Sequence, residues 1–272
     1  MIKSLKDILV VADMDNTLLT PQTGIPQCNI ETIRLFCALG GNFTVATGRT
    51  VESVSRYMNK LTVSAPGITN GGGILYDFAS EKILKAELLI KPTARSAIMD
   101  IKKNFRNVGI EIMSDSGKIH VVQANEFTYR HTFHEKLSYV NCEMDDVKGG
   151  WVKVLFATDN EMQLRIKDFI EARNYPEVYF IQTNDVYYEI MPKGVTKGTA
   201  LKELAAHMNI PMENTFAIGD YYNDIELLNT AGYAVAMGNA PIEVKMAAHE
   251  ITASCIDGGV GQFLYKLIKQ YS

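Results

Sequence analysis

The chain has 272 residues, enough for one large domain or two of ordinary size, and 47% of them are hydrophobic, so it can build a core. A formal net charge of −4, without a basic run or aromatic residues interleaved with basic ones, argues against a nucleic-acid partner. The sequence shows no membrane-spanning apolar run and no signal-peptide stretch, and its four cysteines are scattered, so we expect a cytoplasmic protein with no membrane partner.

The first predicted strand ends in two carboxylates. Residues 8–12 are apolar and rich in β-branched side chains, which predicts a strand buried on both faces, and Asp13 and Asp15 follow directly. Ligands of an open parallel sheet bind beyond the carboxyl ends of its strands, so both acids would reach that edge. Two such close acids are costly to ionise unless a cation lies between them, and oxygen ligands suit magnesium. The alternative is a polar strand end with two solvated acids.

Up to about residue 73, segments typical of helices alternate with segments typical of buried strands. Asn29 can cap a helix, and a second helix is predicted over residues 51–61. Apolar stretches at residues 42–46 and 67–70 predict two more strands, each followed by polar residues or glycines. This order predicts a parallel sheet with helices on both faces and right-handed crossovers.

From about residue 84, neighbouring strands mix with helices. Strands are predicted at residues 108–113, 118–123, 151–158, 178–182 and 186–190, and helices at residues 93–105, 125–136 and 160–173. The strand at 151–158 alternates like one with a half-exposed face. Because this mixture is typical of an α+β module, we expect a cap domain over residues 86–190, inserted into a core domain formed by residues 1–85 and 191–272.

After the insert, the alternation of strand and helix returns. Helices are predicted near residues 198–208, 225–228, 242–248 and 260–269, and strands at 215–218, 233–237 and near 251. Lys197 stands where the first of these helices opens, and the strand at 215–218 is followed by a polar segment that includes Asp220, Asn223 and Asp224. The fold class predicted is therefore α/β.

Polar residues thus follow four predicted strands, with one lysine beside them. The four sets are Asp13 with Asp15, Thr47-Gly48-Arg49, Asn70 with Gly71, and Asp220 through Asp224. If the strands are parallel neighbours, these groups converge at one sheet edge. Several carboxylates, a hydroxyl and a lysine at one point suit magnesium-assisted phosphoryl transfer, since metal and lysine neutralise phosphate oxygens while a carboxylate attacks phosphorus in line.

Four segments in this order resemble the motifs of the haloacid dehalogenase-like hydrolases. They are Asp13-x-Asp15-x-Thr17, Ala46-Thr47-Gly48-Arg49, Gly194-Val195-x-Lys197-Gly198 and Gly219-Asp220-x-x-Asn223-Asp224. The large insert resembles that of the Cof-type subfamily of sugar- and metabolite-phosphate phosphatases. The resemblance implies a doubly wound, mostly parallel, Rossmann-like core with an inserted α+β cap.

The resemblance also implies a function. It indicates a Mg²⁺-dependent phosphatase that acts on small phosphorylated metabolites, with sugar phosphates as the expected class. The alternatives are a phosphomutase of the same fold and a catalytically idle protein that binds phosphorylated metabolites. The metabolite is the expected partner, and the chain is expected to be a monomer or a weak homo-oligomer.

Roles follow from the resemblance, position by position. Asp13 would be the nucleophile that forms an aspartyl-phosphate, and Asp15 would protonate the leaving oxygen and then activate water. The candidate catalytic residues are Asp13, Asp15, Thr47 and Lys197; the candidate substrate-binding residues are Thr47, Gly48, Arg49, Asn70, Gly71, Lys197 and Asn223; the candidate magnesium ligands are Asp13, Asp15, Asp220 and Asp224. Asp15 would use its backbone carbonyl, and Asp224 would orient Lys197 or a metal-bound water.

Some residues keep a second interpretation. Arg49 could contact substrate or the cap, or pair with a core acid and hold the loop. Asn70 with its glycines could line a phosphate pocket or only form a turn. His131 and His134 have a metal-binding spacing, but without a nearby Cys/His cluster we expect solvated cap histidines. Trp151 could face the substrate, but a lone tryptophan at the start of a strand more often packs in a core, which is what we expect.

Three residues depart from the usual pattern of the family. Asn16 stands where glycine is common, and asparagine tolerates left-handed backbone angles better than most residues. Tyr221 and Tyr222 stand where small residues are common, so they could narrow the mouth of the site or contact substrate. None of these three residues replaces a catalytic group.

Overall fold

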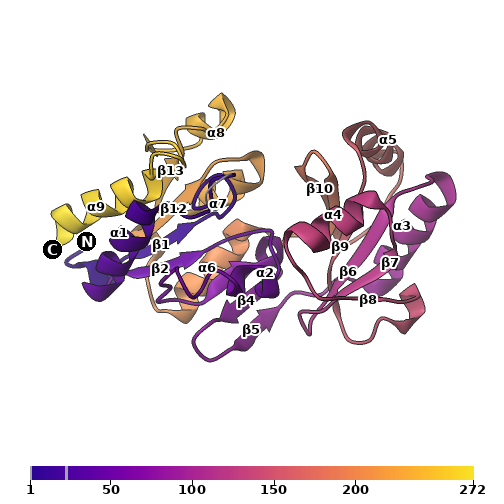
Figure 1. The fold of residues 1–272 in the computed structure, drawn as a ribbon, viewed down its shortest axis with the longest axis horizontal. Helices are drawn as coiled ribbons and strands as arrows, with labels where there is room; N and C mark the ends of the chain where they lie inside the picture. Colours follow the sequence, from indigo (N-terminus) through magenta and orange to yellow (C-terminus); the bar gives the residue numbers. More distant parts are fainter. Residues whose placement is uncertain (1, 22–23) are drawn as a thin grey trace. The chain divides into compact units, whose positions relative to one another are not determined.

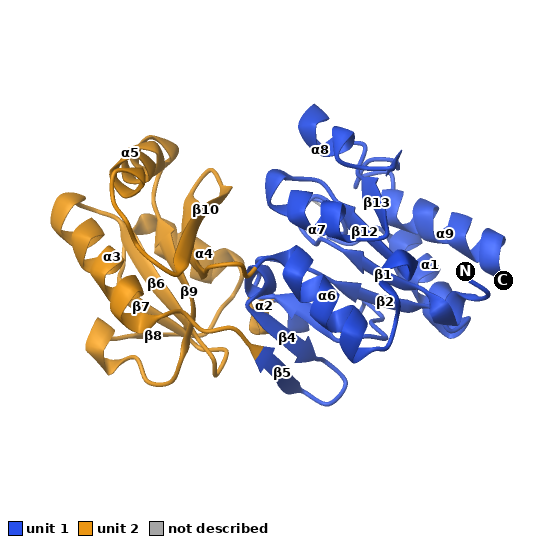
Figure 2. Ribbon diagram, turned by 180° about the vertical axis from the view of Figure 1, so that it is seen from behind, with its two compact units in different colours: residues 1–49, 54–85, 196–272 blue, residues 50–53, 86–195 orange. Residues whose placement is uncertain are grey.

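The computed structural model describes residues 2–21 and 24–272, which divide into two compact units (Figure 2). The core unit comprises residues up to 49, 54–85 and 196–272, and the cap unit comprises residues 50–53 and 86–195. The second boundary lies at 195 rather than at the expected 190, because strand β11 (Tyr187–Pro192) pairs with β10 (Val178–Asn184) up to Pro192. Residues 50–53 group with the cap, where the Glu52 carboxylate accepts hydrogen bonds from Ser138.

The core is built on a five-stranded parallel sheet with the strand order β14-β13-β12-β1-β2 (Figure 1). Its strands are β1 (Leu9–Ala12), β2 (Asn42–Val45), β12 (Thr215–Gly219), β13 (Tyr233–Ala236) and β14 (Glu250–Ile251). Strand β1 is central, and its last residue, Ala12, lies opposite Ile218 of β12 and Val45 of β2. The carboxyl ends of three neighbouring strands are therefore level.

Both faces of this sheet are covered, as the doubly wound fold requires. The core helices are α1 (Gln27–Ala38), α6 (Lys197–His207), α7 (Ile225–Thr230), α8 (Ile242–Met246) and α9 (Gly259–Tyr271). Helix α2 (Val51–Ser55) is divided between the units, since residues 51–53 group with the cap. Val10 of β1 packs in one apolar cluster with residues of α1 and α9, while Leu9 and Val11 pack in another with residues of α6 and α7. None of the helices in the described residues is long and apolar enough to cross a membrane.

Two of these helices differ from the prediction. Helix α1 begins at Gln27 after Pro26, so Asn29 lies inside it, fully buried, and its Oδ1 accepts a hydrogen bond from the Gly261 amide at 2.7 Å. Helix α2 ends at Ser55, because the next amides bond to carbonyls three residues back and the chain continues as turns. Short 3-10 helices lie at Leu5–Asp7, Asn70–Gly72, Met144–Asp146, Met212–Asn214 and Tyr222–Asp224.

The third predicted strand is not part of the parallel sheet. Strand β3 (Gly67–Thr69) pairs antiparallel with β4 (Ile74–Asp77), and β5 (Lys82–Ala86) completes a separate three-stranded sheet. Within the described residues, its strand pairing with the end of β2 is one isolated parallel bridge, Ala46 to Ile68. Three successive residues from Asn70 on have positive φ and reverse the chain at once, which brings β4 antiparallel to β3.

The cap unit is a six-stranded sheet with the order β10-β11-β9-β6-β7-β8, antiparallel except for the pair β7–β8. Its other strands are β6 (Gly109–Ser114), β7 (Ile119–Gln123), β8 (Tyr139–Asn141) and β9 (Trp151–Ala157), and its helices are α3 (Lys91–Asn104), α4 (Glu126–His134) and α5 (Asn160–Glu171). Residues of α3 and α5 pack on one face of the sheet. Trp151 is buried in that apolar core, as expected.

The prediction that β9 has a half-exposed face is wrong. All seven of its residues are buried, including Lys153, whose Nζ donates a hydrogen bond to Glu189 Oε1 of β11 at 2.9 Å. The polar residue that suggested exposure therefore has its partner on a neighbouring strand, which allows it to be buried.

Candidate active site

The central feature of the site is the Asp13 carboxylate at the end of β1. The Asp13 amide donates to the carbonyl of Ile218, which continues the β1–β12 ladder by one residue and fixes the backbone. The side chain is 6% exposed. Because β2 and β12 flank β1 in parallel and end at the same level, the loops that follow all three strands leave the sheet beside Asp13.

Lys197 joins two of the predicted acids. It is the first residue of α6, whose N-cap Thr196 accepts a hydrogen bond from the Thr199 amide at 3.1 Å. Its Nζ donates to Asp13 Oδ1 and to Asp224 Oδ1, each at 2.6 Å. Burial alone would lower the pKa of Lys197, but the two carboxylates raise it above its ordinary value, so the buried side chain is a cation at neutral pH.

The loop after β12 is held by its own acids. Asp220 Oδ1 accepts a hydrogen bond from Thr17 Oγ1 at 2.8 Å, which ties the loops after β1 and β12 together. Asp224 is fully buried, and its Oδ2 accepts from the amides of Asp220 and Tyr221. Since its Oδ1 bonds to Lys197, both oxygens of Asp224 already hold protein groups in place.

Three of the four predicted magnesium ligands lie together. The carboxylates of Asp13, Asp220 and Asp224 each offer an oxygen within 4.8 Å of the others. Burial raises the pKa of Asp13 well above its usual range, with the Asp224 charge adding to it, and the same two causes raise the pKa of Asp220 to about 7. Three acids that share one ammonium group are short of positive charge, and their oxygens suit a hard cation such as Mg²⁺, so this cluster could hold a metal ion.

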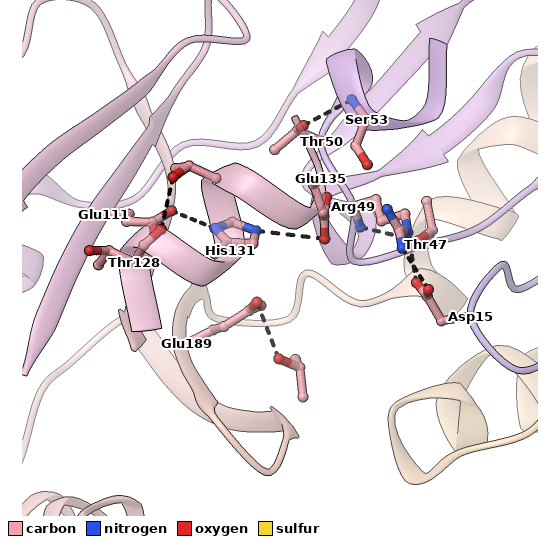
Figure 3. Close-up of polar contacts among 12 residues, drawn as sticks. Asp15, Thr47, Arg49, Thr50, Ser53, Glu111, Thr128, His131, Glu135 and Glu189 are labelled. Carbon is pink, nitrogen blue, oxygen red and sulfur yellow. Dashed lines mark hydrogen bonds and ion pairs between the residues drawn. The ribbon is translucent and has the colours of Figure 1, made fainter. Parts of the chain in front are cut away.

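Asp15 faces a different partner. Its Oδ2 accepts from Arg49 Nε at 2.8 Å and its Oδ1 from Arg49 Nη2 at 2.7 Å (Figure 3). This geometry shows the expected pairing of Arg49 with an acid of the core, and the contact of Arg49 with substrate stays a prediction. The Asp15 carboxylate is outside the three-acid cluster, so its expected contribution to a metal site through the backbone carbonyl stays a prediction. Asn16 has φ 58°, the left-handed conformation that asparagine tolerates.

The loops after β2 and β3 are joined by backbone hydrogen bonds. The Thr47 carbonyl accepts from Gly71, the Arg49 carbonyl accepts from Asn70, and the Arg49 amide donates to Thr47 Oγ1 at 3.1 Å. Gly72 has φ 105°, and a Cβ there would overlap the Thr196 carbonyl oxygen at the start of α6. These glycines therefore form a turn, and the lining of a phosphate pocket by Asn70 and Gly71 stays a prediction.

The roles of the other candidates on these loops stay predictions. Gly48 has open space where a Cβ would be, and Asn70 is buried with its Oδ1 unpartnered. Asn223 is half-buried in the short 3-10 helix Tyr222–Asp224, and its contact with a phosphoryl group stays a prediction. Tyr221 and Tyr222 are exposed beside Asp220, with ring centroids 5.1 Å apart.

The cap contains buried charges that sequence reasoning missed. His131 was expected to be solvated, but it is buried, and its Nδ1 lies 2.8 Å from Glu111 Oε2 (Figure 3). His134 is exposed, as expected. The available signal was a set of charged residues, Glu111, Lys153 and Glu189, each interrupting a strand of otherwise mostly apolar residues. Their partners lie on other elements, so periodicity alone could not pair them.

Comparisons with known proteins agree with the geometry. The model of the haloacid dehalogenase-like hydrolase family matches residues 10–264. The chain is 28% identical to the 5-amino-6-(5-phospho-D-ribitylamino)uracil phosphatase YcsE of Bacillus subtilis, over 93% of each chain, and 25% identical to the pyridoxal phosphate phosphatase YbhA of Escherichia coli, over 94% of this chain and 97% of that one.

Solved structures show the same fold. A crystal structure from Thermotoga maritima has a TM-score of 0.81 at 27% identity and covers 95% of this chain and 97% of its own. A haloacid dehalogenase-like hydrolase from Bacteroides thetaiotaomicron has a TM-score of 0.84 at 23% identity, over 96% of this chain and 99% of that one, which speaks for the fold alone. With the ordered motifs and the inserted cap in place, the chain belongs to the haloacid dehalogenase-like hydrolases, in agreement with the predicted Cof-type resemblance.

Proposed function

We propose that this protein is a Mg²⁺-dependent phosphatase that hydrolyses small phosphorylated metabolites, sugar phosphates among them, through an aspartyl-phosphate on Asp13. The observation that carries the proposal is the buried Asp13 carboxylate, bonded to Lys197 at 2.6 Å beside Asp220 and Asp224. The names of the relatives support it, because the two proteins compared above are phosphatases of small phosphorylated compounds.

The reaction would begin with the Asp13 carboxylate attacking phosphorus. A new bond forms between an Asp13 oxygen and phosphorus while the bond from phosphorus to the ester oxygen breaks, and that oxygen takes the electron pair and a proton from Asp15. Lys197 holds Asp13 in place and balances negative charge on the phosphoryl oxygens. Mg²⁺ bound by Asp13 and Asp220 would neutralise the same oxygens as a Lewis acid.

The second half returns Asp13 to its first state. Asp15, now a carboxylate, takes a proton from a water molecule as that water attacks the aspartyl-phosphate, and inorganic phosphate leaves. Asp15 suits both halves because its side chain is 53% exposed and can meet substrate and water. Thr47, 1% exposed at the end of β2, would donate its hydroxyl to a phosphoryl oxygen.

The test is phosphate release from a panel of phosphorylated metabolites, with Asp13→Asn as the decisive variant. We expect the variant to lose turnover while its unfolding curve stays close to that of the wild type, because an amide is a poor nucleophile. Asp168→Asn, on the exposed face of α5, is the matched control and should keep full activity. Chelation of divalent ions should stop the wild type, and added Mg²⁺ should restore it.

Two results would contradict the proposal. Full activity of Asp13→Asn in the presence of Mg²⁺ would remove Asp13 as the nucleophile, and unchanged rates after thorough chelation would remove the metal. Conversion of one sugar phosphate into its isomer without free phosphate would favour the phosphomutase.

A further inference from the structure

The pair formed by Arg49 and Asp15 is unusually well defined for a contact at the protein surface. Its two hydrogen bonds, 2.8 Å from Nε and 2.7 Å from Nη2, reach different oxygens of the Asp15 carboxylate (Figure 3). The planar fork of a guanidinium matches a carboxylate in this arrangement and fixes the plane of the carboxylate as well as its position. A lysine would fix only the distance.

Arg49 is the anchored member of the pair. Its amide donates to Thr47 Oγ1, its carbonyl accepts from Asn70, and its side chain is only 16% exposed. Its guanidinium carbon also lies 5.9 Å from the ring centroid of Tyr57. The backbone of Arg49 is therefore held by the loops that follow β2 and β3, and its guanidinium lies beside the Tyr57 ring, both independently of Asp15.

Asp15 is the member that needs an anchor. The Asp15 side chain is 53% exposed, and both hydrogen bonds that its carboxylate accepts within residues 2–21 and 24–272 come from Arg49. Its neighbour Asn16 is fixed through its carbonyl, which accepts from Asn239 Nδ2 at 2.9 Å, so the backbone is set while the side-chain torsions depend on Arg49. An exposed carboxylate without such a partner samples several rotamers.

We propose that Arg49 is a positioning residue that orients the Asp15 carboxyl group for proton transfer to the leaving oxygen, an inference that rests on the proposed phosphatase function. When one oxygen of the Asp15 carboxyl group carries the proton, the other oxygen still accepts a hydrogen bond from Arg49. One of the two hydrogen bonds between the guanidinium and Asp15 is therefore kept while the other breaks. The O–H bond of Asp15 then breaks as the ester oxygen leaves phosphorus with its electron pair and takes that proton. Arg49 itself neither gives nor takes a proton.

The experiment compares two substrates that differ in their need for this proton. p-Nitrophenyl phosphate releases a stable phenolate and needs no proton from Asp15, whereas an alkyl ester such as a sugar phosphate from the panel does. The measured quantity is kcat/KM, which reports on steps up to the transfer to Asp13 and excludes the common hydrolytic half. The variants are Arg49→Lys, which keeps the charge and loses the fork, and Arg49→Met.

We expect both variants to lose about ten- to a hundredfold in kcat/KM on the alkyl ester and less than about threefold on the aryl ester, since general acid catalysis matters only for the former. Asp15→Asn should show the same split, and Arg49→Met combined with Asp15→Asn should lose no more on the alkyl ester than Asp15→Asn alone. Arg34→Met, at an exposed position on α1, is the matched control.

Other results would overturn the inference. Equal losses on both substrates with a raised KM would make Arg49 a substrate-binding residue, and a gain in activity would mean that Arg49 restrains Asp15. If the wild type is active but the Arg49 variants change kcat/KM by the same factor on both esters, the positioning role is refuted and the proposed function stands. A wild type that releases no phosphate from either ester refutes both.

Discussion

Each unit of this protein buries a group of charges, and the two groups are built differently. In the core, the acids Asp13, Asp220 and Asp224 lie together around one base, Lys197, whose ammonium group bonds to Asp13 and Asp224. In the cap, Glu111 pairs with His131 and Glu189 pairs with Lys153, so each of these two buried acids contacts a base. These two groups are called the core cluster and the cap cluster below.

Their positions in the sheets differ as well. The core cluster lies on loops and a helix start at the ends of parallel strands, where a ligand can approach. In the cap cluster, Glu111 and Glu189 lie in mid-strand, both opposite Leu155 in the pairing. The two buried acids inside the cap sheet each contact a base, whereas the three acids at the edge of the core sheet have one base among them and suit a further cation. In this protein, buried charge therefore points to a ligand site where the acids outnumber the bases.

The largest effect should come from the core cluster. Replacing Lys197 with Met removes the single base of that group, and we expect kcat to fall about a thousandfold, because a fixed charge aimed at the reacting group is lost. Lys202→Met, at an exposed position on the same helix, should change kcat little. Steady-state phosphate release measures kcat of both variants. If Lys197→Met kept nearly wild-type activity, the core cluster would not differ from the cap cluster in its importance for catalysis.

The cap cluster should respond in stability instead. Lys153→Met leaves Glu189 buried without its base, which costs about 3–5 kcal/mol in the free energy of unfolding. Replacing both partners, Lys153→Met with Glu189→Leu, should recover most of that loss. Urea unfolding followed by fluorescence of Trp151, the one tryptophan of the chain, reports on the cap core.

Lys167→Met, at an exposed position on α5, is the control for that experiment and should unfold like the wild type. If the double variant were no more stable than Lys153→Met alone, an unpaired Glu189 could not be the reason for the loss.

The smallest effect concerns pH. Burial lowers the pKa of His131, but the Glu111 carboxylate, with Glu135, outweighs burial and a small opposing contribution from Lys153, so this pKa lies above its ordinary value of 6.5. A base with a raised pKa stabilises the fold fully below its unfolded-state pKa, and that contribution is lost as pH rises through the folded-state value.

The free energy of unfolding of the wild type minus that of His131→Gln should therefore shrink from about pH 6 to about pH 9. Urea titrations of both proteins across this range measure it. A difference that stays constant or grows with pH would show that the His131 imidazole is not charged in the folded cap.

The elements of the fold could be predicted from local signals, and the core cluster could be predicted because parallel strands end at one sheet edge and because the four ordered motifs resemble a known family. A buried apolar strand that ends in Asp13, and a helix that opens with Lys197, are each visible within a dozen residues. The cap cluster could not be predicted in the same way, since His131 and Glu111 come from different elements and meet only in the folded sheet. For Arg49, local pattern allowed two partners, and the choice of Asp15 depended on how two separate loops pack.

The absence of a side chain at position 72 has a consequence for the whole site. The loop after β3 rests its bare backbone against the first residues of α6, at the residue next to the lysine that reaches Asp13. Even a methyl group at this position would wedge the two segments apart and draw the ammonium away from its carboxylates. The distance between Lys197 and its carboxylates thus depends on a glycine that takes no part in the reaction itself.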